Sequence, residues 1–139
     1  MLHQIIYTSA ASPHLTAIVM RNIAIKARAQ NEALGITGIL LFKDGGILQV
    51  LEGEKDAVQS LYQKIASDSS HTNLTKLIDH AAKRREFPQW SMGFRMVEES
   101  EKLDFAFDLT PKNFKKHLPK DASPELSILT KTYARVHGL

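Results

Sequence analysis

The chain has 139 residues, a formal net charge of +3 and no cysteine. This length suits one domain with a small appendage, and the lack of cysteine excludes disulfide bonds, a thiol nucleophile and thiolate metal sites. No apolar run reaches the length of a membrane span and the N-terminus lacks the pattern of a signal peptide, so we expect a cytoplasmic protein.

The N-terminal segment predicts a strand followed by a helix. Residues 3–9 are rich in β-branched side chains and end at an Ala-Ser-Pro turn, which is typical of a strand. Apolar residues then recur at helical spacing over residues 15–31. Thr16 stands at the start of this pattern, where its hydroxyl can cap the helix.

Two further apolar runs, residues 34–43 and 45–53, predict a β-hairpin. An Asp-Gly-Gly sequence at residues 44–46 joins them, and such a sequence is a strong signal for a tight turn between antiparallel strands. Gly53 ends the second run. We therefore expect the two strands to lie side by side.

The next segment predicts a second helix and two more strands. The helix is expected to begin near Glu54, because acidic residues favour the first turn of a helix. Strands are predicted within residues 73–85 and over residues 91–97. The order β-α-β-β-α-β is that of an α+β, ferredoxin-like fold with an added fifth strand, in which two helices cover one sheet face.

The C-terminal segment, residues 98–139, is more polar and predicts helices. Residues 100–109 are expected to form a short helix. Residues 123–139 predict a final helix, with Ser123 at the N-cap and Pro124 at the first helical position. Its apolar stripe indicates that it packs on another part of the protein.

Gln49 is a polar residue in the middle of an apolar strand. It shares a strand face with Ile47 and Leu51, and a buried amide without partners costs about 1–3 kcal/mol. Tyr7 lies on the strand that the topology places next to it, so the two side chains can meet over the sheet. From the residues alone, Tyr7 also suits a core tyrosine and Gln49 an edge-facing amide.

Other polar or aromatic residues have ordinary structural roles available. Asn31 suits a helix C-cap, His71 a surface loop, and Trp90 and Met92 hydrophobic packing. The basic cluster at residues 83–85 is more typical of a solvated loop than of a nucleic-acid patch. No phosphate-binding loop, nucleophile elbow or metal-ligand spacing occurs in the sequence.

As a set, these residues resemble the BLUF family of flavin-binding, blue-light-sensing domains. The resemblance extends from about Leu2 to Val97 and rests on the motifs GITGIL, QVLEGE and FPQWSM in this order. It implies a sensor domain over residues 1–97 and a C-terminal helical cap over residues 98–139. It also implies a photoreceptor and not an enzyme.

The resemblance further implies a non-covalently bound flavin, FAD or FMN, between the two helices. Tyr7 would be the photochemical donor of an electron and a proton, and Gln49 would lie between Tyr7 and the flavin ring. Asn31 would hold the polar edge of the ring, Ile23 would pack on the ring, and His71 would lie against the flavin on the side of the second helix.

Light would rearrange the hydrogen bonds of Gln49 and shift the flavin absorption to the red. Trp90 and Met92 would respond in the fifth strand, and the C-terminal helices, on the far face of the sheet, would pass the change to an unknown partner protein. A homo-oligomer is expected, with no membrane and no direct nucleic-acid contact. Ser70 stands where the family commonly has a basic residue, which would alter one anchor of the flavin, and residues 83–85 are candidates to replace it.

Two other functions share this order of elements. An RNA-binding domain of the RRM type needs exposed aromatic residues on its central strands, and residues 45–53 contain none. An acylphosphatase-like hydrolase needs an arginine in the loop after the first strand, and residues 8–15 contain none. Both alternatives are therefore weaker than the photoreceptor.

Overall fold

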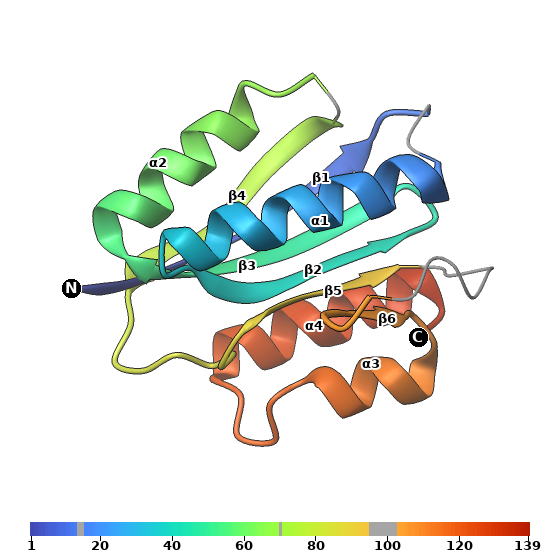
Figure 1. Cartoon of the computed structure of the whole chain (residues 1–139). Helices are drawn as coiled ribbons and strands as arrows, with labels where there is room; N and C mark the ends of the chain where they lie inside the picture. Colours follow the sequence, from blue (N-terminus) through green and yellow to red (C-terminus); the bar gives the residue numbers. More distant parts are fainter. Residues whose placement is uncertain (14–15, 70, 95–102) are drawn as a thin grey trace.

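The computed structural model describes residues 1–13, 16–69, 71–94 and 103–139. One sheet runs through the middle of the protein, with two helices above it and two below it in the view of Figure 1. The strands are β1 (Leu2–Ala11), β2 (Thr37–Lys43), β3 (Gly46–Glu54), β4 (His71–Ala81), β5 (Trp90–Phe94) and β6 (Ala106–Asp108). The helices are α1 (Ala17–Ala33), α2 (Lys55–Ala66), α3 (Pro111–His117) and α4 (Pro124–His137).

The sheet has the strand order β4-β1-β3-β2-β5-β6. Strands β1, β2, β3 and β4 pair antiparallel, whereas β5 pairs parallel to β2 and β6 parallel to β5. The first four strands with α1 and α2 form the predicted ferredoxin-like arrangement, which is confirmed. The fifth strand is confirmed over its described residues, and residues 95–97, which the prediction includes, lie outside them.

The turn between β2 and β3 determines which residues face each other in the middle of the sheet. Lys43 pairs with Gly46, so the loop has two residues, Asp44 and Gly45, with φ values of 50° and 78°. Positive φ at both positions is the tight turn that matches the twist of a hairpin, and Asp-Gly is a preferred sequence for it. This turn sets the register of β3.

Alternate residues of the strands point to opposite faces of the sheet and contribute to two separate hydrophobic cores. On one face, the core under α1 and α2 contains Ile5, Tyr7, Ile47 and Leu51. On the other face, the core over α3 and α4 contains Ile6, Ile39, Leu41, Leu48, Val50, Phe114, Leu126 and Tyr133. Both faces of the sheet are therefore covered, with α3 and α4 on the face opposite α1 and α2; of these two helices, the sequence predicted α4.

The C-terminal segment differs from the prediction in two ways. The helix expected over residues 100–109 is wrong where the chain is described, because Ala106–Asp108 forms strand β6. Its neighbours bond to the open edge of β5, with the Met92 N–H donating to the Phe105 carbonyl at 2.9 Å and the Leu109 N–H to the Phe94 carbonyl at 3.1 Å. Pairing with an available strand edge thus outweighs local propensity. Helix α3 was not predicted.

Local capping signals in the sequence are confirmed. The Thr16 hydroxyl accepts from the Val19 N–H at 3.3 Å at the start of α1. The Ser123 hydroxyl accepts from the Leu126 N–H at 3.2 Å at the start of α4, where Pro124 opens the helix. No helix within the described ranges is long and apolar enough to cross a membrane.

Candidate functional site

Tyr7 and Gln49 meet under helices α1 and α2. They are directly paired residues of neighbouring antiparallel strands, and the Tyr7 hydroxyl donates a hydrogen bond to the Gln49 side-chain oxygen. Both side chains are buried, with exposed fractions of 2% and 4%. The structure therefore brings together the pair that strand alternation placed on one face. Because its oxygen accepts from Tyr7, the Gln49 amide presents its N–H donors at its other end.

Burial determines the protonation state of Tyr7. The pKa of its phenol is raised well above the ordinary value, mainly by desolvation and further by the neighbouring Tyr62 and Asp68. The Tyr62 ring packs against it edge to face, with 5.7 Å between ring centroids. Tyr7 is therefore a neutral hydroxyl at physiological pH, able to donate its proton in a hydrogen bond.

One row of paired residues runs across the sheet through this pair. Gln49 pairs with Leu40, and Leu40 pairs with Met92 on β5. Residues paired in this way share a sheet face, and Met92, like Tyr7 and Leu40, belongs to the core under α1 and α2. Met92 thus lies two strands, or roughly 10 Å, from Gln49 along one row.

Trp90 lies one row further along β5 and is 1% exposed on the same face. Its indole N–H is buried and has no hydrogen-bond acceptor among the described residues. The Arg28 guanidinium donates to the Trp90 backbone carbonyl at 3.3 Å and lies over the Phe105 ring. Trp90 pairs with Gly38, whose φ of 148° and close approach to the Val50 carbonyl leave no space for a side chain.

Helix α1 contributes the remaining predicted residues of this site that are described in full. Asn31 is 2% exposed at the C-terminal end of the helix, where its backbone carbonyl accepts from the Leu34 and Ile36 N–H groups. Ile23 is half-buried against the same core. His71 begins strand β4, but its side chain and Ser70 lie outside the described residues.

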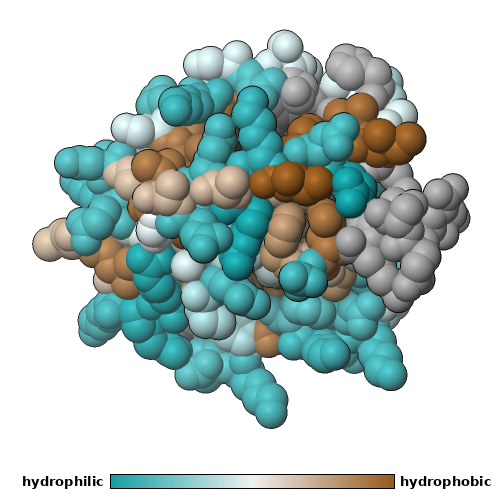
Figure 2. Space-filling view, viewed as in Figure 1, coloured by the Kyte–Doolittle hydropathy of each residue, from teal (hydrophilic) through white to brown (hydrophobic). Residues whose placement is uncertain are grey.

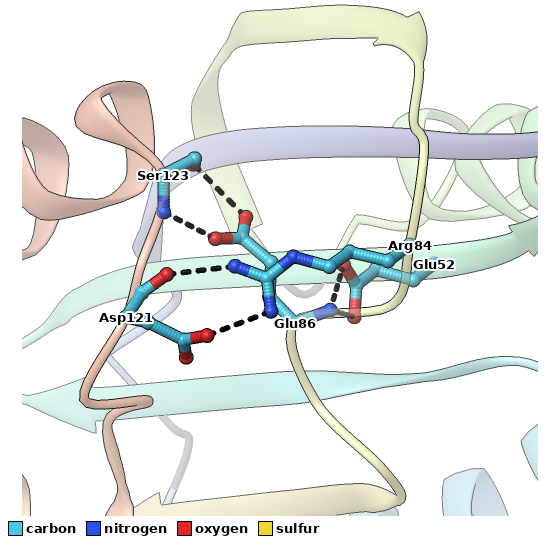
Figure 3. A network of polar contacts seen from close by, with 5 residues as sticks. All are labelled: Glu52, Arg84, Glu86, Asp121 and Ser123. Atoms are coloured by element: carbon cyan, nitrogen blue, oxygen red, sulfur yellow. Dashed lines mark hydrogen bonds and ion pairs between the residues drawn. The ribbon is translucent and has the colours of Figure 1, made fainter.

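A second polar cluster lies at the end of β3 and was not predicted as a site (Figure 3). The buried Glu52 carboxylate accepts from the backbone N–H groups of Glu86, at 2.9 and 3.1 Å, and of Phe87, at 2.9 Å. The Glu86 carboxylate accepts from the Ser123 N–H at 2.5 Å and from the Ser123 hydroxyl at 3.0 Å. The Gln4 amide nitrogen donates to both carboxylates, at 3.1 and 2.9 Å. The alternation of β3, which puts Glu52 on the side of Val50, was the available sequence signal.

The basic cluster at residues 83–85 has structural partners in its two arginines. Arg84 forms an exposed ion pair with Asp121 at 3.0 Å and also donates to the Asp121 carbonyl. Arg85 donates to the Gly35 carbonyl at 2.9 Å and to the Thr37 hydroxyl at 2.7 Å. These contacts join the loop after β4 to the segment before α4 and to the segment that leads from α1 into β2.

This α+β fold, with its buried tyrosine–glutamine pair beneath two helices, is the arrangement that the resemblance to flavin-binding sensor domains implies. A family model described as "Sensors of blue-light using FAD" matches residues 2–93. The chain belongs to this family, the BLUF family, and the resemblance of its motifs is confirmed. BLUF domains bind flavin and act as blue-light sensors in signal transduction.

Two curated relatives illustrate how the domain is used elsewhere. The chain is 34% identical over 87 residues to the photoactivated adenylate cyclase subunit beta of Euglena longa, covering 62% of this chain and 10% of that protein. It is 30% identical over 111 residues to the blue light- and temperature-regulated antirepressor BluF of Escherichia coli (strain K12), covering 78% of this chain and 28% of that protein. The chain thus spans a minor part of each relative.

Solved structures share the fold. The structure described as "BlrP1 BLUF" aligns with a TM-score of 0.68 at 26% identity, over 94% of this chain and 88% of that one. "BlsA ground state" aligns with a TM-score of 0.66 at 26% identity, over 84% and 70%. Klebsiella pneumoniae BlrP1 with FMN and cyclic diGMP aligns with a TM-score of 0.73 at 26% identity, over 97% and 36%.

The residues of this chain suit a polar aromatic cofactor on the face under α1 and α2. The buried indole N–H of Trp90 lacks an acceptor among the described residues, and an unpaired buried donor costs about 1–3 kcal/mol. The Gln49 amide adds donors on the same face. The RNA-binding alternative is not favoured, because the sheet face that such a domain keeps open is covered here by α3 and α4.

Proposed function

We propose that the protein is a blue-light photoreceptor that responds through the Tyr7–Gln49 pair. The observation that carries this proposal is the buried hydrogen bond from the Tyr7 hydroxyl to the Gln49 oxygen under α1 and α2. Membership of the BLUF family supplies the flavin and the blue-light response of the class. The rearrangement of this pair in light is our inference for this chain.

The flavin is proposed to be held by five residues, Tyr7, Ile23, Asn31, Gln49 and His71. Asn31 is a buried amide at the end of α1, which suits the polar edge of a flavin ring, and Ile23 offers an apolar surface on the same helix. We propose FAD as the native cofactor, after the family description, with FMN as the alternative, since a similar structure is described with FMN.

When bound, the flavin supplies a chromophore that absorbs blue light and then accepts an electron. Tyr7 is suited to donate an electron together with a proton, because its phenol is protonated and its O–H already points at the Gln49 oxygen. An amide has a donor end and an acceptor end, so Gln49 has two distinct hydrogen-bonded arrangements available. Light selects between these two arrangements, and the protein returns to the first in darkness.

The signal is proposed to leave through strand β5. Met92 lies on the row of Gln49, and Trp90 has a buried N–H able to respond to a new acceptor. Residues 98–139 are proposed to act as a helical cap on the sensor domain of residues 1–97, and to pass the change to a partner protein. We further propose a homo-oligomer in the cytoplasm.

The proposal is tested by the absorption spectrum of the purified protein. We expect a yellow protein whose flavin spectrum shifts to the red under blue light and recovers in darkness. Gln49→Leu should keep the fold and the flavin but lose the normal red shift. Gln63→Leu, the same change at an exposed position on α2, should behave as wild type. A colourless protein that takes up no flavin, or a normal photocycle in Gln49→Leu, would contradict the proposal.

A further inference from the structure

A groove of about 460 Å³ lies between helices α3 and α4, on the opposite side of the sheet from Tyr7 and Gln49. Its floor is apolar, with contributions from Leu118, Leu126 and Ala134. The Thr130 hydroxyl, which also lines the groove, donates to the Leu126 carbonyl of its own helix at 2.8 Å. The floor therefore offers apolar surface to a ligand, and its Thr130 hydroxyl already has a partner within α4. Such a floor suits an apolar group better than a small polar ligand.

The rim of this groove is positively charged. Lys115 and Lys120 lie on the α3 side, and Lys131 and Arg135 lie one turn apart on α4. All four are exposed, and no aspartate or glutamate among the described residues lines the groove. Within the described part of the chain, none of the four forms an ion pair. Figure 2 shows the surface over α3, in the lower part of the view, as mostly hydrophilic.

We propose that this groove binds an acidic, amphipathic helical segment of a partner protein. An amphipathic helix places apolar side chains every three or four residues into such a groove, and its flanking carboxylates would meet the four cations of the rim. Helix α4 has 14 residues and is about 21 Å long, so the side of the groove that it forms can contact several turns of a bound helix. This inference deepens the proposed signalling function by naming the chemistry of the partner.

The position of the groove connects it to the sheet. The Tyr133 hydroxyl on α4 donates to the carbonyl of Gly46, the first residue of the strand that carries Gln49, at 2.8 Å. Glu86 holds Ser123 at the other end of α4. Because α4 forms one wall of the groove, any displacement of α4 against the sheet changes the groove width.

The test uses a fluorescent synthetic helical peptide with leucine at every third and fourth position and glutamate elsewhere. Its counterpart carries lysine in place of every glutamate. Fluorescence anisotropy with the full chain in darkness should show binding of the glutamate peptide alone, and binding should weaken as salt is raised. The double variant Lys120→Glu with Lys131→Glu should weaken binding about tenfold or more.

A matched control places the same charge change elsewhere. Lys26 on α1 and Lys64 on α2 are exposed and do not line the groove, so Lys26→Glu with Lys64→Glu should leave the peptide affinity unchanged. Equal affinity for both peptides, no binding of the glutamate peptide, or equal losses in both double variants would overturn the proposal. Duplex DNA bound as tightly as the peptide would overturn it too, since it would indicate a general cationic surface.

Two further measurements separate this inference from its alternatives. If sedimentation shows that the groove variant abolishes a self-associated form, the occupant is a second copy of the chain and the proposal is wrong. The flavin spectrum of each sample is recorded beside the binding curve. Peptide binding by a protein without flavin would leave the groove assigned and the proposed photoreceptor function refuted, whereas a normal photocycle without peptide binding would refute the groove alone.

Discussion

The Glu52 carboxylate is fully buried near the end of β3, where the backbone N–H groups of Glu86 and Phe87 and the Gln4 amide donate to it. Desolvation by burial raises the pKa of Glu52 above its ordinary value of 4.5. The three hydrogen bonds lower this pKa, but their effect is smaller than that of desolvation. A carboxyl group with a raised folded pKa stabilises the fold fully below its unfolded pKa. It loses that contribution as the pH rises through the folded pKa.

Replacing this carboxylate therefore has an effect that depends on pH. Glu52→Gln puts an NH₂ group against backbone donors and should lower the free energy of unfolding by about 1–3 kcal/mol. The deficit relative to wild type should be larger near pH 4.5 than at neutral pH, because the wild type gains stability on protonation. Urea unfolding at several pH values measures both effects.

The matched control for this change lies two residues away. Glu54 is exposed and pairs with the N-terminal amine, so Glu54→Gln should lose at most about 1 kcal/mol. Equal losses in the two variants would contradict the role of Glu52. A deficit that stays constant from pH 4.5 to neutral pH would contradict the raised pKa.

Single residues of the candidate site differ in how far the sequence could predict them. Strand alternation was sufficient to put Gln49 on the face of Ile47 and Leu51, and adjacent strands brought Tyr7 into reach. The contact of Glu52 with Glu86 could not be predicted, because 34 residues separate them and an irregular loop supplies the donors. Alternation indicates which side chains are buried, but it does not indicate which loop satisfies them.

Helix α4 is held at its first turn by one side chain of the loop before β5. Glu86 accepts two hydrogen bonds from Ser123 and one from Gln4. Beside it, Arg84 forms an ion pair with Asp121 of the same segment. The side chain of Arg84 is 59% exposed and that of Asp121 is 74% exposed. Each of the two neighbouring contacts has two bonds to this segment (Figure 3), and they differ in burial, because the Glu86 contact is partly buried and the Arg84 contact is exposed.

This difference predicts unequal effects of two alanine substitutions. Glu86→Ala leaves partly buried donors without an acceptor and should lower stability by about 1–3 kcal/mol. Arg84→Ala removes an exposed pair and should cost less than about 1 kcal/mol. In hydrogen exchange, Glu86→Ala should also speed exchange of amides in the first turns of α4. Similar losses in both variants, or unchanged exchange there, would show that α4 is held by its apolar face alone.

At the scale of elements, the sequence predicted the features that depend on a few consecutive residues, namely the helix caps and the hairpin turn. The caps at Thr16 and Ser123 and the Asp44–Gly45 turn depend on a few consecutive residues, and each is confirmed. Strand β6 depends instead on the open edge of β5, and Phe114 of helix α3 is buried in the core beyond the sheet. These partners are distant in the chain, so residue patterns alone did not indicate β6 or α3.

At the scale of the whole protein, the sheet separates the candidate photoactive pair from the C-terminal helices. Gln49 faces α1 and α2, while its neighbours Leu48 and Val50 face α3 and α4. A change in the backbone of β3 therefore reaches both layers. The Tyr133 hydroxyl is bonded to the same strand at Gly46, so α4 has a direct polar contact with the strand of Gln49 as well as apolar packing.

This contact can be removed without touching the face of Tyr7 and Gln49. Tyr133→Phe keeps the ring in the core and deletes only the hydroxyl, so it should cost about 0.5–1.5 kcal/mol. We expect the light-induced red shift of the flavin to persist, while the difference in hydrogen exchange between light and dark in α4 becomes smaller. Thr132→Val is the control, since that hydroxyl donates to the Ile128 carbonyl of α4 itself and not to the sheet. If Tyr133→Phe leaves the light-dependent exchange of α4 at its wild-type size, the coupling of β3 to α4 must depend on apolar packing alone.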